Sequence, residues 1–331
     1  MKGVLLINLG TPNSPAVKDV RKYLTQFLND KYVIDINPIT RFFLVNGIIV
    51  PFRASKSAKL YKQIWTKEGS PLLFHGEKVK ALLQKELGDN FLVELGMRYQ
   101  TPSIESAFQK LVDANVVDIV VIPMYPQYAY SSTESTIVEV ERIAKKFRFP
   151  SIKIVKTFFN RNGFINAWSD ATKHIKMEDY DFFLFSYHGL PERQIKRVYP
   201  NYCGINDSCC SMITEKNNLC YRAACYETTR QLVKKLNIPT GKYASSFQSR
   251  LNDKWLKPYS DKVVEEKATE GIKKMLVFSP SFIADCLETT YEIGVEYNEL
   301  FKKFGGTEIT LVESLNENPV WVSFLKELAT T

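Results

Sequence analysis

The sequence predicts an α/β protein made of two similar Rossmann-like halves, each a doubly wound parallel sheet covered by helices. Short apolar runs suited to strands buried on both faces alternate with segments whose apolar spacing is near 3.6 residues, as in helices. The second half of the chain also repeats the pattern of the first. The runs lie at residues 4–9, 92–95, 117–122, 152–157, 182–187 and 275–279, with helices expected between them, for example over 103–114 and 226–236.

The repeat places a strand, an arginine, a helix, a second strand and a proline in the same order. Arg98 precedes Pro123 by 25 residues in the first half, and Arg250 precedes Pro280 by 30 residues in the second. This order indicates a duplication, against the alternative of a chance match between two common βαβ units. Because residues 160–163 (NRNG) are turn-like, we expect an N-terminal half over 1–160 and a C-terminal half over 161–331.

Composition limits the class of protein. The 331 residues are 45% hydrophobic and 24% charged, which excludes a disordered chain, collagen and a small disulfide scaffold. The net charge of +8 favours anionic partners, but no run of five or six basic residues occurs, so nucleic acid is not expected. No Walker loop, dinucleotide glycine fingerprint or nucleophile elbow is present, so nucleotide-dependent chemistry is not expected either.

The chain shows no targeting segment. The N-terminal apolar stretch 4–7 is too short for a secretory signal, and no small-residue cleavage site follows it. The longest apolar stretch, 42–52, is well short of the roughly 20 residues needed to cross a bilayer. We therefore expect a cytoplasmic protein without a transmembrane helix, and peripheral contact with the inner face of the membrane is left open.

His188 is the first candidate for chemistry. It directly follows the predicted strand 182–187, and Gly189 and Pro191 open a loop beside it. In parallel α/β folds, ligands bind beyond the carboxyl ends of the strands. A neutral imidazole at such a place can accept a proton near pH 7 or bind a metal. The alternative is a structural histidine that hydrogen-bonds a loop carbonyl.

A group of acids follows the predicted strand 275–279. On an α-helix, Asp285, Glu288, Glu292, Glu296 and Glu299 fall within an arc of about 80°. Like charges four residues apart repel by roughly a few tenths of a kcal/mol per pair, so this acidic helix, residues 285–299, calls for basic partners or a divalent metal. A solvated helix face is the alternative, but the position at a strand's carboxyl end favours function.

Two further segments are candidates for a pocket wall. The loop 125–133 carries Tyr125, Tyr128 and Tyr130, which either line a flat aromatic pocket or pack in the core. The segment 36–52, which we call the apolar lip, walls a pocket, lies on a membrane surface or forms a buried helix. Its apolar residues include Phe42, Phe43, Leu44, Ile48, Ile49 and Phe52, and the basic residues Arg41, Arg53, Lys56 and Lys59 flank it.

Five of the six cysteines lie within 23 residues, at Cys203, Cys209, Cys210, Cys220 and Cys225. In a reducing compartment such clustering favours metal ligation over disulfides. The gaps between them are wider than the two residues typical of zinc ribbons, so an iron–sulfur cluster is favoured over zinc. Disulfides or unreactive thiols are the alternatives.

Taken together, these residues resemble the ferrochelatase family, whose members insert ferrous iron into a porphyrin in the last step of haem synthesis. The resemblance runs nearly end to end. It is based on motifs that occur in order at residues 6–12 (LINLGTP), 46–49 (NGII), 69–72 (GSPL), 96–99 (GMRY), 123–128 (PMYPQY), 186–189 (SYHG), 247–250 (FQSR) and 285–289 (DCLET).

The resemblance implies two Rossmann-like halves with the porphyrin in the cleft between them, and a reaction in which Fe²⁺ enters protoporphyrin IX to give protohaem and two protons. It implies His188 and Glu288 as the metal-binding and proton-handling pair, with Glu292 and Glu296 continuing an acidic path. With Tyr125 of the aromatic loop, the candidate substrate-binding residues are Arg53, Tyr61, Ser70, Arg98 and Tyr99, which match family positions near the porphyrin. The apolar lip matches the family's pocket lip, which in relatives can touch the membrane.

Two departures from the family pattern matter. Cys286 stands where animal enzymes have a histidine two residues before the catalytic glutamate, which puts a metal-relay role in doubt. Some relatives carry a 2Fe–2S cluster on C-terminal cysteines, whereas here the cysteines lie in an insert, residues 203–225. Since bacterial relatives with internal cysteines exist, we expect a 2Fe–2S cluster in this chain. The first choice of ligands is Cys203, Cys210, Cys220 and Cys225, with Cys209 as a substitute for Cys210.

Three alternatives are open at this point. A chelatase of the same fold would act on another tetrapyrrole or metal, such as cobalt with a sirohydrochlorin-type ring, although such relatives are usually shorter and lack an apolar lip. A haem or porphyrin carrier without turnover would not need His188 and the acidic helix. A redox or iron sensor would use the cysteines. The oligomeric state and the choice between protoporphyrin and coproporphyrin are also left open.

Overall fold

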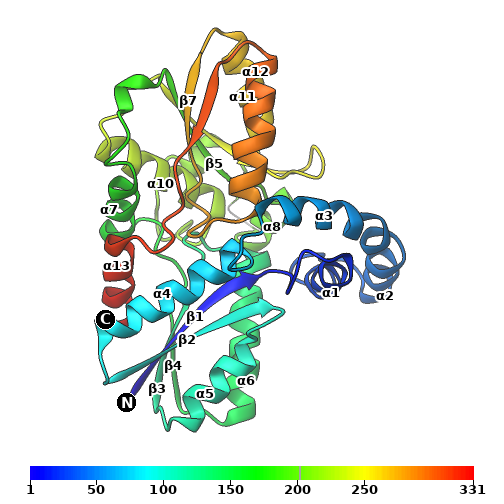
Figure 1. The fold of residues 1–331 in the computed structure, drawn as a ribbon, viewed down its shortest axis with the longest axis vertical. Helices are drawn as coiled ribbons and strands as arrows, with labels where there is room; N and C mark the ends of the chain where they lie inside the picture. Colours follow the sequence, from blue (N-terminus) through cyan, green and yellow to red (C-terminus); the bar gives the residue numbers. More distant parts are fainter. Residues whose placement is uncertain (201–202) are drawn as a thin grey trace. The chain divides into compact units, whose positions relative to one another are not determined.

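The computed structural model describes residues 1–200 and 203–331, which form two compact units (Figure 1). The first unit comprises Met1–Tyr125, Tyr130–Lys156 and Val322–Thr331, and the second comprises Pro126–Ala129 and Thr157–Trp321. The last ten residues thus belong with the N-terminal part of the chain, where Lys326 pairs with Glu86 at 3.2 Å. A single domain boundary near residue 160 does not account for these C-terminal residues, which belong to the first unit.

The first unit contains a four-stranded parallel sheet in the order β2-β1-β3-β4. The strands are β1 (Lys2–Gly10), β2 (Phe91–Tyr99), β3 (Asp118–Pro123) and β4 (Ser151–Ile154). Four successive residues of β1, from Val4 to Ile7, are fully buried, because helices cover both faces of the sheet. This is why the strand reads as a continuous apolar run and not as an alternating one.

Helices α5 (Ile104–Asp113) and α6 (Ser135–Phe147) pack on one face of this sheet, where Phe108 and Val140 share a buried cluster with Leu5 of β1. Helix α5 begins at Ser103, whose side chain accepts a hydrogen bond from the Ser106 N–H, as expected of a serine N-cap. The other helices of the unit are α1 (Val17–Leu28), α2 (Pro38–Phe43), α3 (Val50–Ile64) and α4 (Pro71–Leu87), with a π-helix, η1 (Leu44–Ile49), between α2 and α3.

The second unit contains another four-stranded parallel sheet, in the order β6-β5-β7-β8. Its strands are β5 (Phe182–His188), β6 (Tyr243–Gln248), β7 (Lys274–Phe278) and β8 (Glu308–Leu311). The helices of this part are α7 (Asn162–Ala171), η3 (Met177–Asp179), α8 (Glu192–Val198), α9 (Asp207–Cys210), α10 (Tyr221–Lys235), α11 (Ser260–Thr269) and α12 (Asn298–Lys303), and α13 (Pro319–Thr330) ends the chain.

The two sheets share one topology. The first strand of each unit lies between the second and the third, and the fourth is at the far edge. The third strand of each sheet is followed along the chain by a loop, a π-helix and an α-helix, namely η2 (Tyr130–Glu134) before α6 and η4 (Leu287–Tyr297) before α12. These findings confirm the predicted α/β class with two Rossmann-like sheets, and they extend the repeat that the sequence indicates.

Candidate active site

His188 is the last residue of β5 and lies at the carboxyl edge of the second sheet, where it pairs with Gln248 of β6. Its Nδ1 atom is buried and has no hydrogen-bond partner among the described residues. The ring meets Phe282 edge to face, with 6.1 Å between the ring centroids. Buried polar atoms are nearly always paired in proteins, so this nitrogen calls for a partner that residues 1–200 and 203–331 do not supply.

The peptide group that follows His188 is held at both ends. Its carbonyl accepts a hydrogen bond from the Tyr221 hydroxyl at 2.8 Å, and its N–H, which belongs to Gly189, donates to the Gln248 carbonyl at 2.8 Å. A Cβ atom on Gly189 would lie 2.6 Å from that carbonyl oxygen, which leaves no room for a side chain. The two hydrogen bonds fix the direction in which the chain leaves β5.

Gln248 links β5 to the π-helix η4. Its Oε1 accepts a hydrogen bond from the Ser186 hydroxyl at 2.7 Å, and its Nε2 donates to the Glu288 carbonyl at 2.9 Å. The same Nε2 donates to Glu292 Oε2 at 3.2 Å. Since Gln248 is 1% exposed, these buried contacts hold the first turn of η4 against the strand that carries His188.

The acidic segment is a π-helix and not the α-helix that the sequence predicts. η4 spans 11 residues, and its i→i+5 hydrogen bonds widen each turn by about one residue. Side chains four residues apart, such as those of Glu288, Glu292 and Glu296, are offset by about 40° around an α-helix of about 3.6 residues per turn. Around the wider π-helix they are offset by a similar angle in the opposite sense, so they share one face in either case. π-Helical turns mostly occur singly and are frequent at functional sites, so a run of this length favours a function.

Two acids of the predicted acidic helix, residues 285–299, lie outside η4. Asp285 lies before η4, and its carboxylate accepts hydrogen bonds from Asn316 Nδ2 at 2.9 Å and from the Ser314 N–H at 3.4 Å. Glu299 lies on the next helix, α12. The prediction of a single α-helical stripe over 285–299 is therefore wrong, because helical hydrogen bonding starts after Asp285 and changes register before Glu299.

Glu292 is held by several donors at once. Its carboxylate accepts hydrogen bonds from the Ser249 N–H and the Tyr297 hydroxyl, both at 2.8 Å, as well as from the Ser249 hydroxyl and from Gln248. Burial, and then the charge of Glu292, raises the pKa of Tyr297, so this hydroxyl keeps its proton and donates it in the hydrogen bond. Sequence reasoning assigned no role to Gln248, Ser249 or Tyr297, although the motif at 247–250 marks a strand's carboxyl end.

Cys286 caps the π-helix. Its N–H donates to the Thr289 hydroxyl at 3.0 Å, and the Thr289 hydroxyl donates back to the Cys286 carbonyl at 3.2 Å. Burial, and then the nearby charge of Glu288, raises the pKa of the thiol well above its usual range. A neutral, 8% exposed thiol in a capping position is a structural group, in keeping with the doubt about a relay role.

In the first unit, Arg98 and Tyr99 end β2 and meet at Asp30. Oδ2 of Asp30 accepts hydrogen bonds from Arg98 Nη2 at 2.7 Å, from the Tyr99 hydroxyl at 2.9 Å and from the Ser135 hydroxyl at 2.6 Å. Tyr99 is 1% exposed, and burial, followed by the charge of Asp30, raises the pKa of its hydroxyl. Sequence reasoning missed Asp30 and Ser135, because no local pattern connects them to β2.

The other candidate binding residues of the first unit differ in exposure. Ser70 is 3% exposed, and its hydroxyl shares a hydrogen bond of 2.7 Å with Thr11 Oγ1. Tyr61 is half-buried and Arg53 is exposed, both on α3. The hydroxyl of Tyr125 is buried and makes no hydrogen bond of ordinary length to the described residues. Burial raises its pKa, and the nearby Thr136 hydroxyl opposes that shift.

The structure connects some predicted residues and not others. Gln248 joins the His188 strand to Glu288 and Glu292 in the second unit, and Asp30 joins Arg98 to Tyr99 in the first. Within residues 1–200 and 203–331, no three His, Cys, Asp or Glu side chains are arranged to hold a metal ion. The predicted metal residues His188, Glu288, Glu292 and Glu296 are thus not gathered into such a group in the part of the chain that the structure describes.

Comparison with known proteins decides the family. The family model described as Ferrochelatase matches residues 1–331, the whole chain. The chain belongs to the ferrochelatase family. A curated ferrochelatase from Coxiella burnetii is 44% identical over 331 residues, covering 99% of this chain and 92% of the relative. One from Legionella pneumophila is 42% identical over 332 residues, covering 99% of this chain and 98% of the relative.

Solved structures support the fold. SirB from Bacillus subtilis, solved with Fe³⁺, superposes with a TM-score of 0.54 at 14% identity, covering 99% of this chain and 96% of that one. The sirohydrochlorin chelatase SirB from Bacillus subtilis subspecies spizizenii, solved with cobalt, gives a TM-score of 0.53 at 13% identity, covering 100% and 96%. The family match confirms the predicted enzyme class, a metal chelatase and lyase of haem biosynthesis.

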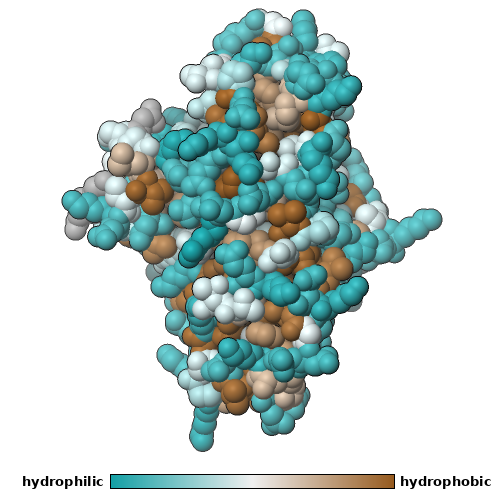
Figure 2. Space-filling model, turned by 90° about the vertical axis from the view of Figure 1, so that its left-hand side faces the viewer, coloured by the Kyte–Doolittle hydropathy of each residue, from teal (hydrophilic) through white to brown (hydrophobic). Residues whose placement is uncertain are grey.

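The apolar lip of this ferrochelatase-family chain is exposed and is not a buried helix. Its side chains on α2, η1 and α3 have large exposed fractions, namely Ile39 70%, Phe42 58%, Phe43 67%, Ile48 57% and Phe52 80%. Val45 and Val50 face inward and are buried. By contrast, apolar residues on the face drawn in Figure 2 are dispersed among polar ones. No helix among the described residues combines the length and apolarity needed to span a bilayer.

The clustered cysteines interact with one another. The sulfur atoms of Cys209 and Cys210 lie 3.7 Å apart. The Cys210 and Cys220 thiols shift each other's pKa, which is raised for Cys210 and lowered for Cys220. Cys220 is the N-cap residue of α10, and its pKa is lowered first by the Cys210 thiol and also by the Ala223 N–H. Burial raises the pKa of Cys225, which is fully buried.

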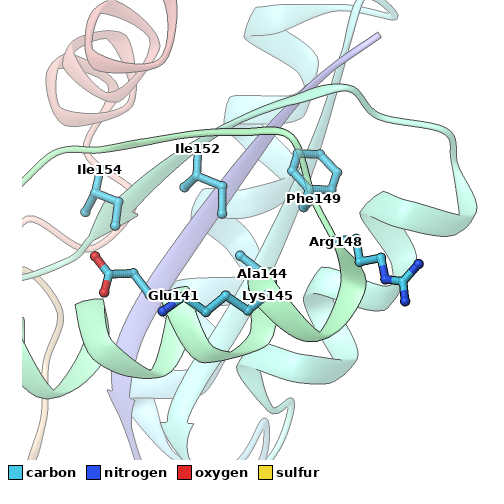
Figure 3. Close-up of a pocket in the computed structure, with 7 residues that line it drawn as sticks. All are labelled: Glu141, Ala144, Lys145, Arg148, Phe149, Ile152 and Ile154. Atoms are coloured by element: carbon cyan, nitrogen blue, oxygen red, sulfur yellow. The ribbon is translucent and has the colours of Figure 1, made fainter.

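A groove on the first unit lies apart from all of these residues. Figure 3 shows it between α6, with Glu141 and Lys145 and the C-cap residue Arg148, and the strand β4, which contributes Ile152 and Ile154. None of the predicted catalytic, binding or cluster residues lines it.

Proposed function

We propose that this chain inserts Fe²⁺ into protoporphyrin IX to give protohaem, with His188 and Glu288 as the pair that handles metal and protons. One observation carries the proposal: the unpaired, buried Nδ1 of His188 at the carboxyl end of β5, with η4 and its glutamates held to the neighbouring strand by Gln248. A ring nitrogen without a protein partner is free to accept a proton or to bind a metal.

Insertion of Fe²⁺ into a porphyrin has three chemical requirements. A pyrrole nitrogen lone pair must point out of the ring plane, two N–H protons must leave, and Fe²⁺ must lose water. A pocket that bends the macrocycle supplies the first as strain of about 1–5 kcal/mol. An imidazole and a carboxylate supply the rest by accepting protons and by replacing water on the metal. His188 and Glu288 have these functional groups.

Glu288 and Glu296 are proposed to guide the cation toward His188. Both lie on η4. Glu296 is exposed and Glu288 is half-buried, so the acids run from solvent inward. Glu292, between them in the sequence, has a carboxylate already engaged by Ser249 and Tyr297. We therefore propose that Glu292 adds negative charge to the path but is not itself a ligand while those hydrogen bonds last.

The porphyrin is proposed to contact residues of the first unit at the carboxyl ends of its strands and on α3. Arg98 is the candidate for a porphyrin carboxylate, because its guanidinium retains part of its exposure, whereas Tyr99 and Ser70 are buried in hydrogen bonds of their own. Tyr99 and Ser70 are therefore proposed to shape the site. Tyr61, Arg53 and the buried Tyr125 hydroxyl complete the set.

The test of this proposal compares His188→Ala and Glu288→Ala with the parent chain. Porphyrin binding is followed by fluorescence and metallation by absorbance, with protoporphyrin, coproporphyrin and a sirohydrochlorin-type ring, and with Fe²⁺ and Co²⁺. Each variant is expected to lose nearly all iron insertion and to keep porphyrin binding. Near-normal turnover by either variant, or a parent chain that metallates only the sirohydrochlorin-type ring, contradicts the proposal.

We also propose that the cysteine segment, residues 203–225, binds a 2Fe–2S cluster. Two of the donors are neighbours: the sulfur atoms of Cys209 and Cys210 lie 3.7 Å apart. The Cys220 thiol and burial raise the pKa of Cys210, and burial raises that of Cys225, while Arg222, only 7% exposed, opposes both shifts. A buried cation beside several thiols suits an anionic thiolate-bound group. In the described residues these thiols do not yet form a group of three ligands, so their approach would accompany cluster assembly.

The ligands proposed for the cluster are Cys203, Cys210, Cys220 and Cys225, with Cys209 in place of Cys210 as the variant. When bound, such a cluster would brace the segment or respond to redox state, and iron insertion itself needs no electron. Anaerobically purified protein is expected to be red-brown with about two irons and two acid-labile sulfides per chain. Colourless protein with one zinc per chain contradicts the cluster and leaves the chelatase proposal standing.

Finally, we propose that the protein works in the cytoplasm and touches the inner face of the membrane through the apolar lip. Exposed Phe42, Phe43 and Phe52 lie close in sequence to the basic residues Arg53 and Lys56, which is the combination that binds anionic lipid surfaces. Vesicles with and without anionic lipid are the probe. Sedimentation with anionic vesicles that falls on Phe42→Ser and Phe43→Ser supports the proposal, and no sedimentation of the parent chain contradicts it.

A further inference from the structure

Tyr221 connects two parts of the second unit that the proposed function treats separately. It is the first residue of α10, and its hydroxyl donates to the His188 carbonyl at 2.8 Å and shares a hydrogen bond of 3.1 Å with the Ser281 hydroxyl. Its side chain is buried, with 6% of the residue exposed. Ser281 lies in the loop after β7, so the one hydroxyl reaches the carboxyl ends of two neighbouring strands.

The residues on either side of Tyr221 contact the cysteine segment. The N–H of Cys220, the N-cap of α10, donates to the Asn217 carbonyl at 2.8 Å, and the Asn217 side chain donates to the Cys209 carbonyl at 2.7 Å. Arg222 donates from Nη1 to the Asn206 carbonyl at 3.0 Å, and the Asn206 side chain in turn accepts the Cys209 N–H. Three consecutive residues at the start of one helix thus make contacts in two directions, with the cysteine segment and with His188.

The contact with His188 acts on the backbone of that residue. Tyr221 holds the carbonyl of the peptide group between His188 and Gly189, while the Gln248 carbonyl holds the N–H of the same group. The orientation of this peptide group sets where the imidazole lies, because the ring has no hydrogen bond of its own at Nδ1. A small displacement of the start of α10 would therefore change the orientation of the His188 imidazole ring.

We propose that Tyr221 is a positioning residue that couples the state of the Cys210–Cys220 thiols to the orientation of His188. The proposal builds on the role of His188 in the proposed function. A change in the cysteine segment that moves Cys220 at the start of α10 is transmitted by the Tyr221 hydroxyl to the His188 peptide group. The cysteine segment would then adjust chelatase activity without taking part in the reaction.

The first test is Tyr221→Phe, which keeps the ring and removes the hydroxyl. The matched control is Tyr259→Phe, since Tyr259 is the N-cap of α11 and its buried hydroxyl has no hydrogen-bond partner among the described residues. The loss of one buried hydrogen bond is expected to lower kcat about fivefold in Tyr221→Phe, with KM for porphyrin unchanged. The control is expected to keep the parent values. Equal kcat in Tyr221→Phe and the parent chain overturns the proposal.

A spectroscopic readout separates positioning from general loss of structure. The chain has 3 histidines, so the imidazole ¹⁵N signals of His188 are identified by their absence in His188→Ala. Tyr221→Phe should shift the His188 signals and leave those of His75 and His174 in place, with an unchanged melting temperature. Shifts at all three histidines, or at none, overturn the proposal. Because this readout needs no turnover, it also holds if the chain fails to metallate a porphyrin.

The coupling itself is tested with Cys220→Ser, alone and combined with Tyr221→Phe. Serine is a good N-cap residue, so α10 keeps its start while the thiol is removed. Cys220→Ser in the parent chain is expected to shift the His188 signals. In a chain that already carries Tyr221→Phe, adding Cys220→Ser is expected to shift them little further, because the effects of coupled residues are not additive. Additive shifts contradict the coupling. Absence of the proposed 2Fe–2S cluster is detected separately, as parent protein that contains neither iron nor acid-labile sulfide.

Discussion

A hydrogen bond of 2.8 Å runs from the Ser249 N–H to the carboxylate of Glu292, across 43 residues of sequence. Ser249 has φ of 60°, a left-handed conformation that is uncommon outside glycine. Its N–H and hydroxyl both turn toward Glu292 in this conformation. The π-helix is therefore held to the carboxyl end of β6 by an acid that the sequence suggests as a metal ligand.

Glu292→Gln is expected to destabilise the protein. The amide oxygen can still accept the hydrogen bonds that the Ser249 N–H and Tyr297 donate to Oε1, but the NH₂ cannot accept those that the Ser249 hydroxyl and Gln248 donate to Oε2. A lost hydrogen bond to a charged group costs ~2 kcal/mol. The measurement is the free energy of unfolding in urea. Glu299→Gln, at an exposed position of α12, is the control and should stay within about 0.5 kcal/mol of the parent. Equal stability of Glu292→Gln and the parent would show that the carboxylate is not a structural anchor.

Asp30→Asn is expected to cost ~3 kcal/mol, because removal of one partner leaves the Arg98 guanidinium as a poorly compensated charge in a largely buried site. The same change weakens the hydrogen bonds from Tyr99 and Ser135. Unfolding in urea measures the loss. Asp113→Asn, which alters only an exposed hydrogen bond from Gln109, is the control, and a similar cost for both variants would contradict the central role of Asp30.

The fold was predictable because its strands are buried on both faces. The apolar runs 4–9 and 182–187 overlap β1 and β5, which lie inside the two sheets, and the run 152–157 overlaps the edge strand β4. The other short edge strand, β8, was not predicted. Position at a strand's carboxyl end also identified His188. These features are local in sequence, so a periodic pattern or a short motif can report them.

The parts of the site that could not be predicted depend on contacts distant in sequence. A spacing of four residues between glutamates fits an α-helix and a π-helix alike, so the register of η4 is decided by Gln248 and Ser249, not by its own residues. Asp30 reaches Arg98 across 68 residues. The exposure of the apolar lip was also undecided, because Phe42 and Val45 are equally apolar and only the fold turns one outward and the other inward.

The contrast between exposed Phe42 and buried Val45 gives a prediction for the apolar lip. Phe42→Ser is expected to change the free energy of unfolding by less than about 0.5 kcal/mol, since its side chain is already in solvent. Val45→Ala, at 0% exposure, is expected to cost ~2 kcal/mol through lost packing. Thermal or urea unfolding of both variants measures the difference. A loss at Phe42 as large as that at Val45 would mean that the lip packs against protein.

Gly189→Ala tests the peptide group that follows His188. The new Cβ would lie 2.6 Å from the Gln248 carbonyl oxygen, and this backbone atom cannot move without breaking the pairing of β5 with β6. The variant is expected to lose ~2 kcal/mol of stability, in the range for strain and overpacking, and to lower iron insertion by displacing His188.

Gly47→Ala is the matched control, because a Cβ there meets nothing within 4 Å in the helical segment η1. Alanine in a helix is favoured over glycine by roughly 0.5–1 kcal/mol, so the control should be neutral or more stable. Urea unfolding and metallation assays measure both variants, and a fully active, stable Gly189→Ala chain would show that the direction of the chain after His188 is not critical.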